Sequence, residues 1–144
     1  NKGVSKGFTD LYLEGSLHHE FSSILLRNYA AQFPGTEWTD ALPAKFKYRG
    51  DGVQSLREGT SSTQAAEKYL KDGFIAEYAT SSLEEDFNML AESLFTGGKE
   101  FWTWYEKYPA LRRKADLVMA FYGNIDPWFT QDKFRSFTKI SEKA

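Results

Sequence analysis

The chain contains no cysteine and only two histidines among its 144 residues. Without cysteine it has no disulfide, no cysteine-ligated zinc or iron–sulfur site and no thiol nucleophile. A metal site must therefore use histidine and carboxylates, and the two histidines are consecutive, His18 and His19. The absence of cysteine fits a reducing compartment as well as an exported protein, so it does not decide where the protein acts.

Long apolar runs and an excess of positive charge are also missing. No run of 18 apolar residues occurs, so the sequence predicts no membrane-spanning helix. The 18 Lys and Arg residues are balanced by 20 Asp and Glu residues, and the net charge of −2 indicates no basic surface for nucleic acid. The length and the 41% hydrophobic content are those of one globular domain.

Aromatic residues, in contrast, are abundant and make up 17% of the chain. Exposed rings stack on sugars or on peptide partners, whereas rings at helical spacing more often belong to a core. The cluster of Trp102, Trp104, Tyr105 and Tyr108 has helical spacing. We therefore expect most of these rings to be buried.

Apolar residues recur at helical spacing along most of the chain and predict a mainly α fold. No segment alternates strictly enough to predict a strand, and residues 30–62, with their Pro and Gly, are predicted to be irregular. The pair Ser81-Ser82, followed by Glu84 and Glu85, predicts the start of a helix. The basic run at residues 112–114 predicts a solvated helix face. The predicted helices span residues 13–29, 63–70, 83–95, 100–108 and 109–122, with a last helix after Pro127.

The segment HEFSS at residues 19–23 matches the first part of the H-E-x-x-H motif. In that motif two histidines four residues apart bind zinc from one helix face, and the Glu beside the first acts as general base. Here Ser23 holds the place of the second histidine. The spacing sets His19, Glu20 and Ser23 on the side of the helix away from Leu17, Phe21 and Leu25. The alternative interpretation of the same pattern is an ordinary polar helix face.

Three blocks of the chain resemble one family of bacterial proteins. LHHEFSSILL at residues 17–26 is similar to the HHEFxHILHQ stretch of zinc-binding metallopeptidases, also called substrate import-associated zinc metallohydrolase lipoproteins. GFI at residues 73–75, followed by Tyr78-Ala79 and then Glu85-Asp86-Phe87, resembles the family's GFI…YA…EDFAE. A weaker third block, from Lys114 to Arg135, resembles the tail of the family. The three blocks keep the family's order.

This resemblance implies a zincin-like domain over residues 1–144. Its helical core is mainly α, or α+β if a small sheet lies beside the helices, with the strands then coming from an N-terminal portion outside this sequence. The second block also resembles the gluzincin proteases of the lethal-factor toxin type. Carried over to this chain, that likeness implies that His19 and Glu85 bind zinc, that Glu20 is the general base, and that Tyr78 assists the oxyanion.

The chain departs from the family pattern at two positions. Ser23 stands at a zinc-ligand position, and Met89 stands where an acid would support a metal-binding histidine. Glu92 lies on the same helix face as Glu85, seven residues on, without falling naturally at the vacant ligand position. A catalytic zinc has three protein ligands, so we expect zinc at low occupancy and weak or no hydrolase activity.

The function expected from the resemblance is that of a metallopeptidase-like protein associated with nutrient import. The implied location is the bacterial outer membrane, cell surface or periplasm, as a lipoprotein, and the implied partners are a peptide or glycan ligand and components of import machinery. The alternative is a non-catalytic accessory module that binds glycans or peptides through the same cleft. Zinc content and the effect of Ser23→His separate the two hypotheses.

Overall fold

Capping residues begin the two longest helices of the core in the computed structural model, which describes residues 6–138. The Ser82 hydroxyl accepts a hydrogen bond from the backbone N–H of Glu85 and begins α5 (Leu83–Thr96), as predicted. Pro109 occupies the first turn of α7 (Pro109–Ile125), where its missing N–H is not needed.

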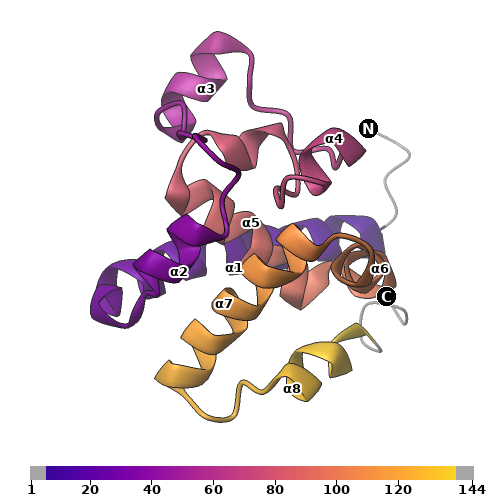
Figure 1. Cartoon of the computed structure of the whole chain (residues 1–144). Helices are drawn as coiled ribbons and strands as arrows, with labels where there is room; N and C mark the ends of the chain where they lie inside the picture. The colour runs from indigo at the N-terminus through magenta and orange to yellow at the C-terminus, as the bar shows by residue number, and fades with distance from the viewer. Residues whose placement is uncertain (1–5, 139–144) are drawn as a thin grey trace.

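The described part of the chain is mainly helical, with irregular connections between the helices, as Figure 1 shows, and the mainly α prediction is confirmed. α6 begins directly after α5, at Gly98, whose φ of +57° lies in the left-handed region that glycine tolerates. The remaining elements are α1 (Lys6–Asn28), η1 (Ala30–Gln32), α2 (Gly35–Asp40), α3 (Gly52–Glu58), α4 (Glu67–Leu70), η2 (Glu77–Thr80), α6 (Gly98–Lys107) and α8 (Gln131–Ser136).

Two segments differ from the sequence prediction. Residues 30–62 contain three short helical elements, which are too short for apolar periodicity to reveal. One of them, α3, is capped by Asp51, whose side chain accepts a hydrogen bond from the backbone N–H of Gln54. Residues 63–66 are not helical; Ala65 forms an isolated antiparallel bridge with Ala76. No sheet is present among the described residues.

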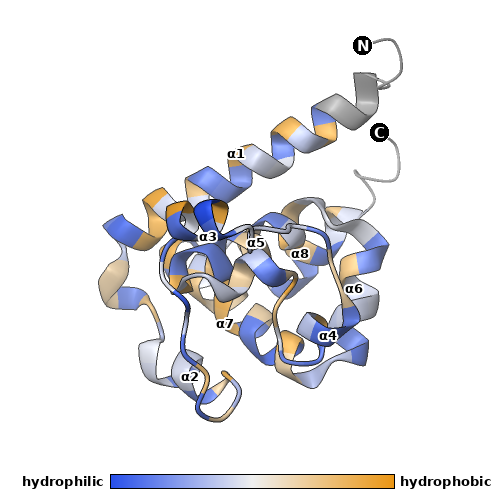
Figure 2. Ribbon diagram, turned by 90° about the horizontal axis from the view of Figure 1, so that it is seen from above, coloured by the Kyte–Doolittle hydropathy of each residue, from blue (hydrophilic) through white to orange (hydrophobic). Residues whose placement is uncertain are grey.

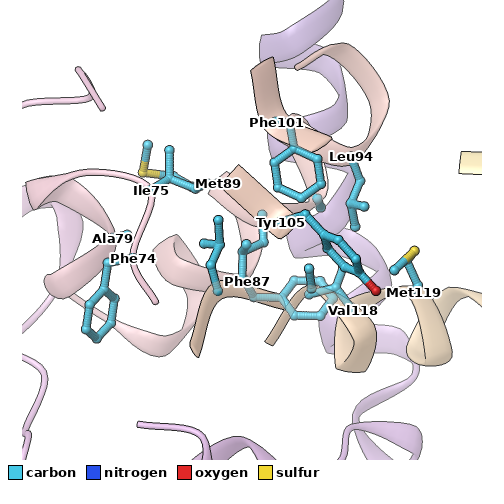
Figure 3. Packing of buried hydrophobic residues seen from close by; sticks show 14 of the residues in the cluster. Phe74, Ile75, Ala79, Phe87, Met89, Leu94, Phe101, Tyr105, Val118 and Met119 are labelled. Atoms are coloured by element: carbon cyan, nitrogen blue, oxygen red, sulfur yellow. The ribbon is translucent and has the colours of Figure 1, made fainter. Parts of the chain in front are cut away.

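Helix α5 lies at the centre of the fold and contacts α1, η2, α6, α7 and α8. The side chains that it shares with α6 and α7 form the apolar core seen in Figure 3, where Phe87 and Leu94 face Phe101 and Val118. Burial of the aromatic cluster is confirmed, because Trp102, Tyr105 and Tyr108 are each less than a tenth exposed and Trp104 is partly buried against the core.

A charged pair lies inside this core. The Lys114 ammonium, on α7, lies 2.7 Å from both carboxylate oxygens of Asp86 on α5, and neither side chain is exposed. Tyr48 donates a hydrogen bond to Asp86 at 2.6 Å, and the Phe74 ring lies beneath the ammonium. The prediction of a solvated basic face at residues 112–114 is therefore wrong for Lys114. Its side chain is buried because it pairs with Asp86, which lies 28 residues away in the sequence and so leaves no local signal.

Helix α1 leaves most of its apolar stripe on the outside. Gly15 and Ser22 are buried against α5, and Leu25 is partly buried against the core, whereas Leu17, Phe21 and Ile24 are 48–66% exposed. Figure 2 shows α1 along one edge of the molecule. Within residues 6–138, no helix is both long enough and apolar enough to span a bilayer.

Loss of one partner of the Lys114–Asp86 pair is expected to destabilise the fold strongly. Lys114→Met leaves Asp86 buried without its counter-charge and should lower the free energy of unfolding in urea by about 3–5 kcal/mol. Adding Asp86→Asn should recover most of this loss. The control is Glu106→Gln, which removes an exposed partner of Arg135 and should have little effect. Similar losses for the Lys114 and Glu106 variants would contradict the assignment.

Candidate functional site

His19 lies between two glutamates of the neighbouring helix. Its Nε2 atom is 2.9 Å from Glu85 Oε2, and its Nδ1 atom is 3.2 Å from Glu92 Oε2. The imidazole is only 17% exposed. The structure therefore brings together His19 and Glu85, as the sequence predicts, and adds Glu92 as a direct partner of the second ring nitrogen.

Two glycines make this approach possible. A Cβ atom on Gly15 of α1 would lie 2.8 Å from Glu92 Oε1, so glycine lets the two helices come close at this glutamate. A Cβ atom on Gly52, the first residue of α3, would collide with the Tyr78 hydroxyl and lie 2.8 Å from Glu85 Oε1. The start of α3 therefore closes directly over the Glu85 carboxylate.

The two residues predicted to act in catalysis also face this point. Tyr78 lies in η2, and its hydroxyl donates a hydrogen bond to the Glu85 carboxylate. Glu20 follows His19 on α1 and is close enough for its negative charge to act on Tyr78. Unlike His19, Glu20 is exposed.

His19 and Glu20 separate two cavities. The larger, of about 660 Å³, lies on the side of Met89, Glu92 and the extended segment 63–65. The smaller, of about 330 Å³, is bounded by the beginnings of α3 and α5 and by Ser23. His19 and Glu20 line both cavities, and we refer to the two cavities together as the cleft.

Ser23 and Met89, the two departures from the family pattern, both line this cleft. The Ser23 hydroxyl accepts a hydrogen bond from Asn88 Nδ2 at 2.6 Å, while Asn88 Oδ1 accepts from Ser22 at 2.6 Å. The buried Asn88 thus uses the hydroxyl of Ser23 as a hydrogen-bond acceptor and holds Ser23 against α5. Met89 is 6% exposed and lies in the wall of the larger cavity without a polar role.

The surroundings of His19 favour its charged form. Burial alone lowers the pKa of His19, but the hydrogen bonds and charges of Glu85 and Glu92 outweigh burial and raise it to about 9. Burial likewise raises the pKa of Glu85, but His19 and Tyr78 outweigh it and hold this pKa below its usual value. At neutral pH, an imidazolium therefore donates to two carboxylates.

Burial, the hydrogen bond to Glu85 and the negative charges nearby raise the pKa of Tyr78. The Tyr78 hydroxyl consequently keeps its proton over the physiological range and remains a hydrogen-bond donor.

The donor set does not fit a catalytic zinc ion. Only His19 Nε2 and the Glu85 carboxylate converge on one point, and the hydroxyl at position 23 is hydrogen-bonded to Asn88. Within the described residues no group of three or more His, Asp or Glu side chains is arranged to hold a metal ion. The arrangement lacks the third protein ligand that a catalytic zinc requires.

Three residues of the site escaped the sequence prediction: Gly15, Gly52 and Asn88. Glycine inside a helix is unfavourable, so Gly15 within the predicted first helix was a signal of a close approach by another segment. Gly52 and Asn88 carry no such signal, because their partners come from segments that are distant in the sequence.

No family model, curated protein or solved structure matches this chain.

The raised pKa of His19 predicts a pH-dependent stability in the presence of EDTA. The pKa is about 9 in the folded state against 6.5 for an ordinary histidine. The ion pairs of charged His19 with Glu85 and Glu92 therefore stabilise the folded state fully below pH 6.5, and this contribution is lost as the pH rises through 9. The contribution to the free energy of unfolding is at most about 3 kcal/mol. Urea unfolding at several pH values should show this loss in the wild type and not in His19→Gln, whereas parallel profiles would contradict it.

Gly52→Ala should displace Tyr78 and Glu85 and so weaken their hold on His19. We expect the pKa of His19 to fall from about 9 towards its ordinary value of 6.5. An NMR titration of the imidazole measures this directly. Gly35→Ala is the matched control, because its Cβ would meet only the Phe33 ring at 3.9 Å or more. An unchanged His19 titration in Gly52→Ala would refute the proposed packing.

Proposed function

We propose that this protein is a zinc metallopeptidase-like protein with an incomplete metal site, weak or inactive as a hydrolase, that retains the cleft at His19 for ligand binding. The observation that carries the proposal is the placement of His19 between Glu85 and Glu92, with Tyr78 on Glu85. An ordinary polar helix face would be solvated, whereas this one is turned into the molecule and satisfied by long-range partners.

The residues of the cleft support binding without requiring a metal. The His19 imidazolium and the Tyr78 hydroxyl are both donors, while Glu20 provides an exposed acceptor beside them. The extended segment 63–65 forms one wall of the larger cavity and is suited to lie beside an extended peptide. A peptide ligand would thus find donors and acceptors along the cleft.

A non-catalytic module for glycans is the second candidate, and one observation favours it. Tyr12 and Trp104 line the larger cavity, and Tyr12 is 69% exposed, so both rings are available to stack on a ligand. Most other rings of the aromatic cluster are buried in the core. Binding of the protein to a glycan array, compared with its binding to a library of extended peptides, separates the two candidates.

The assignment to a bacterial cell-surface or periplasmic lipoprotein near import machinery belongs to the same proposal and rests on the family resemblance alone.

The metal-site proposal is tested by restoring the missing ligand. Ser23→His places an imidazole at the edge of the smaller cavity, facing the His19–Glu85 pair. We expect zinc binding in calorimetric titrations to tighten by at least ~100-fold over the wild type. The cobalt complex should show the absorption of a tetrahedral site. Adding Glu85→Gln should remove the gain, because it takes away one of the converging ligands.

Two outcomes would overturn this proposal. One is zinc binding by the wild type as tight as that of Ser23→His. The other is a gain in Ser23→His that survives Glu85→Gln, since the new histidine would then bind metal elsewhere. Hydrolysis of a fluorogenic peptide mixture, measured with Glu20→Gln as the control that keeps the metal ligands, shows whether the restored site also acts as a peptidase.

A further inference from the structure

The outer side of α1 carries an apolar stripe that nothing in the described chain covers. Leu13, Leu17, Phe21 and Ile24 are 58, 66, 48 and 52% exposed. We call these four side chains the α1 stripe. They follow one another at intervals of four, four and three residues and therefore form one line along the helix. The opposite face of α1 is the one that packs on α5.

We propose that the α1 stripe pairs with the same stripe of a second copy of this chain, in an antiparallel dimer with two-fold symmetry. This inference does not rest on the proposed function, because it is argued from the exposure of four apolar side chains, although one of them, Ile24, also lines the smaller cavity beside His19. Scattered exposed apolar residues are ordinary on protein surfaces, whereas a continuous line of four on one helix marks an interaction surface.

The size of the stripe suits such a contact. Its side chains expose roughly 100 Å² each, on the order of 400 Å² together. Since about 60% of an interface is apolar, this corresponds to roughly 700 Å² per copy, close to the ~800 Å² per partner of a standard interface.

The stripe is complementary to itself when reversed. In an antiparallel pair centred between residues 18 and 19, Leu13 faces Ile24 of the second copy, and Leu17 faces Phe21 to within one residue. A two-fold axis at this point therefore covers all four side chains in both copies with the same contact made twice. A parallel pairing about a two-fold axis would instead set each residue beside its own equivalent, so that Asp10 would face Asp10 and Arg27 would face Arg27.

Charge supports the same register. Asp10 lies one turn before Leu13, and Arg27 lies one turn after Ile24, so each Asp10 faces the Arg27 of the second copy. Arg27 also pairs with Glu84 of its own chain at 3.0 Å, so in the dimer it would stand between two acids. Both side chains are exposed. The register sets neither Glu14 nor Glu20 against another acid, since these face serine and leucine positions. Like charges therefore do not oppose the dimer.

Sedimentation equilibrium on the whole chain tests the proposal. We expect the wild type to show twice the mass of one chain at concentrations from about 10 to 200 µM. Leu17→Glu should raise the dissociation constant of the dimer at least tenfold without altering the thermal midpoint of the monomer, because its side chain has no core contact to lose. Leu56→Glu on α3 is the matched control, with 65% exposure against 66% for Leu17, and should leave the dimer unchanged.

The register has its own test in a charge reversal. Asp10→Arg should weaken the dimer by setting two arginines together at each end, and adding Arg27→Asp should restore it. A wild type that stays monomeric at every concentration would overturn the proposal and leave the stripe to a different protein or to a lipid surface. Equal effects of Leu17→Glu and Leu56→Glu, or failure of the double reversal to restore the dimer, would also overturn it.

Discussion

The buried ion pair between Asp86 and Lys114 is the constraint on which the rest of the structure depends. A pair of opposite charges is stable in the core only if hydrogen bonds replace the water that each group has lost. The Asp86 carboxylate accepts such hydrogen bonds from Lys114 and from Tyr48. Because these partners come from α7 and from the segment before α3, the pair fixes the position and the rotation of α5 about its own axis. No apolar contact in the core has such a narrow geometrical tolerance.

The rotation of α5 decides what the site contains. Glu85 precedes Asp86 directly, so when Asp86 turns into the core, Glu85 turns towards α1, and Glu92, two turns further on, follows it. His19 is then held by carboxylates on both ring nitrogens. The charge balance of the site follows from this placement: one imidazolium between two acids, where a zincin would have a metal ion and a further histidine.

Much of this could be predicted from the sequence. The first helix, the capped start at Ser82 and the proline at the start of α7 depend on neighbouring residues, and periodicity and capping chemistry reveal them. The pairing of His19 with Glu85 was implied by resemblance rather than by spacing. The buried state of Lys114 and the role of Asn88 could not be predicted, since their partners lie 28 and 65 residues away and leave no local pattern.

The sequence by itself determined that the protein is mainly α-helical and that it has no cysteine ligand for a metal, with His18 and His19 as its two histidines. Only the tertiary structure decided which face of α1 is buried. Helical periodicity identifies an apolar stripe but not its partner, and here the polar face is the buried one because its groups find hydrogen bonds on α5. The apolar stripe is thereby left on the surface, where its contacts depend on other molecules rather than on this fold.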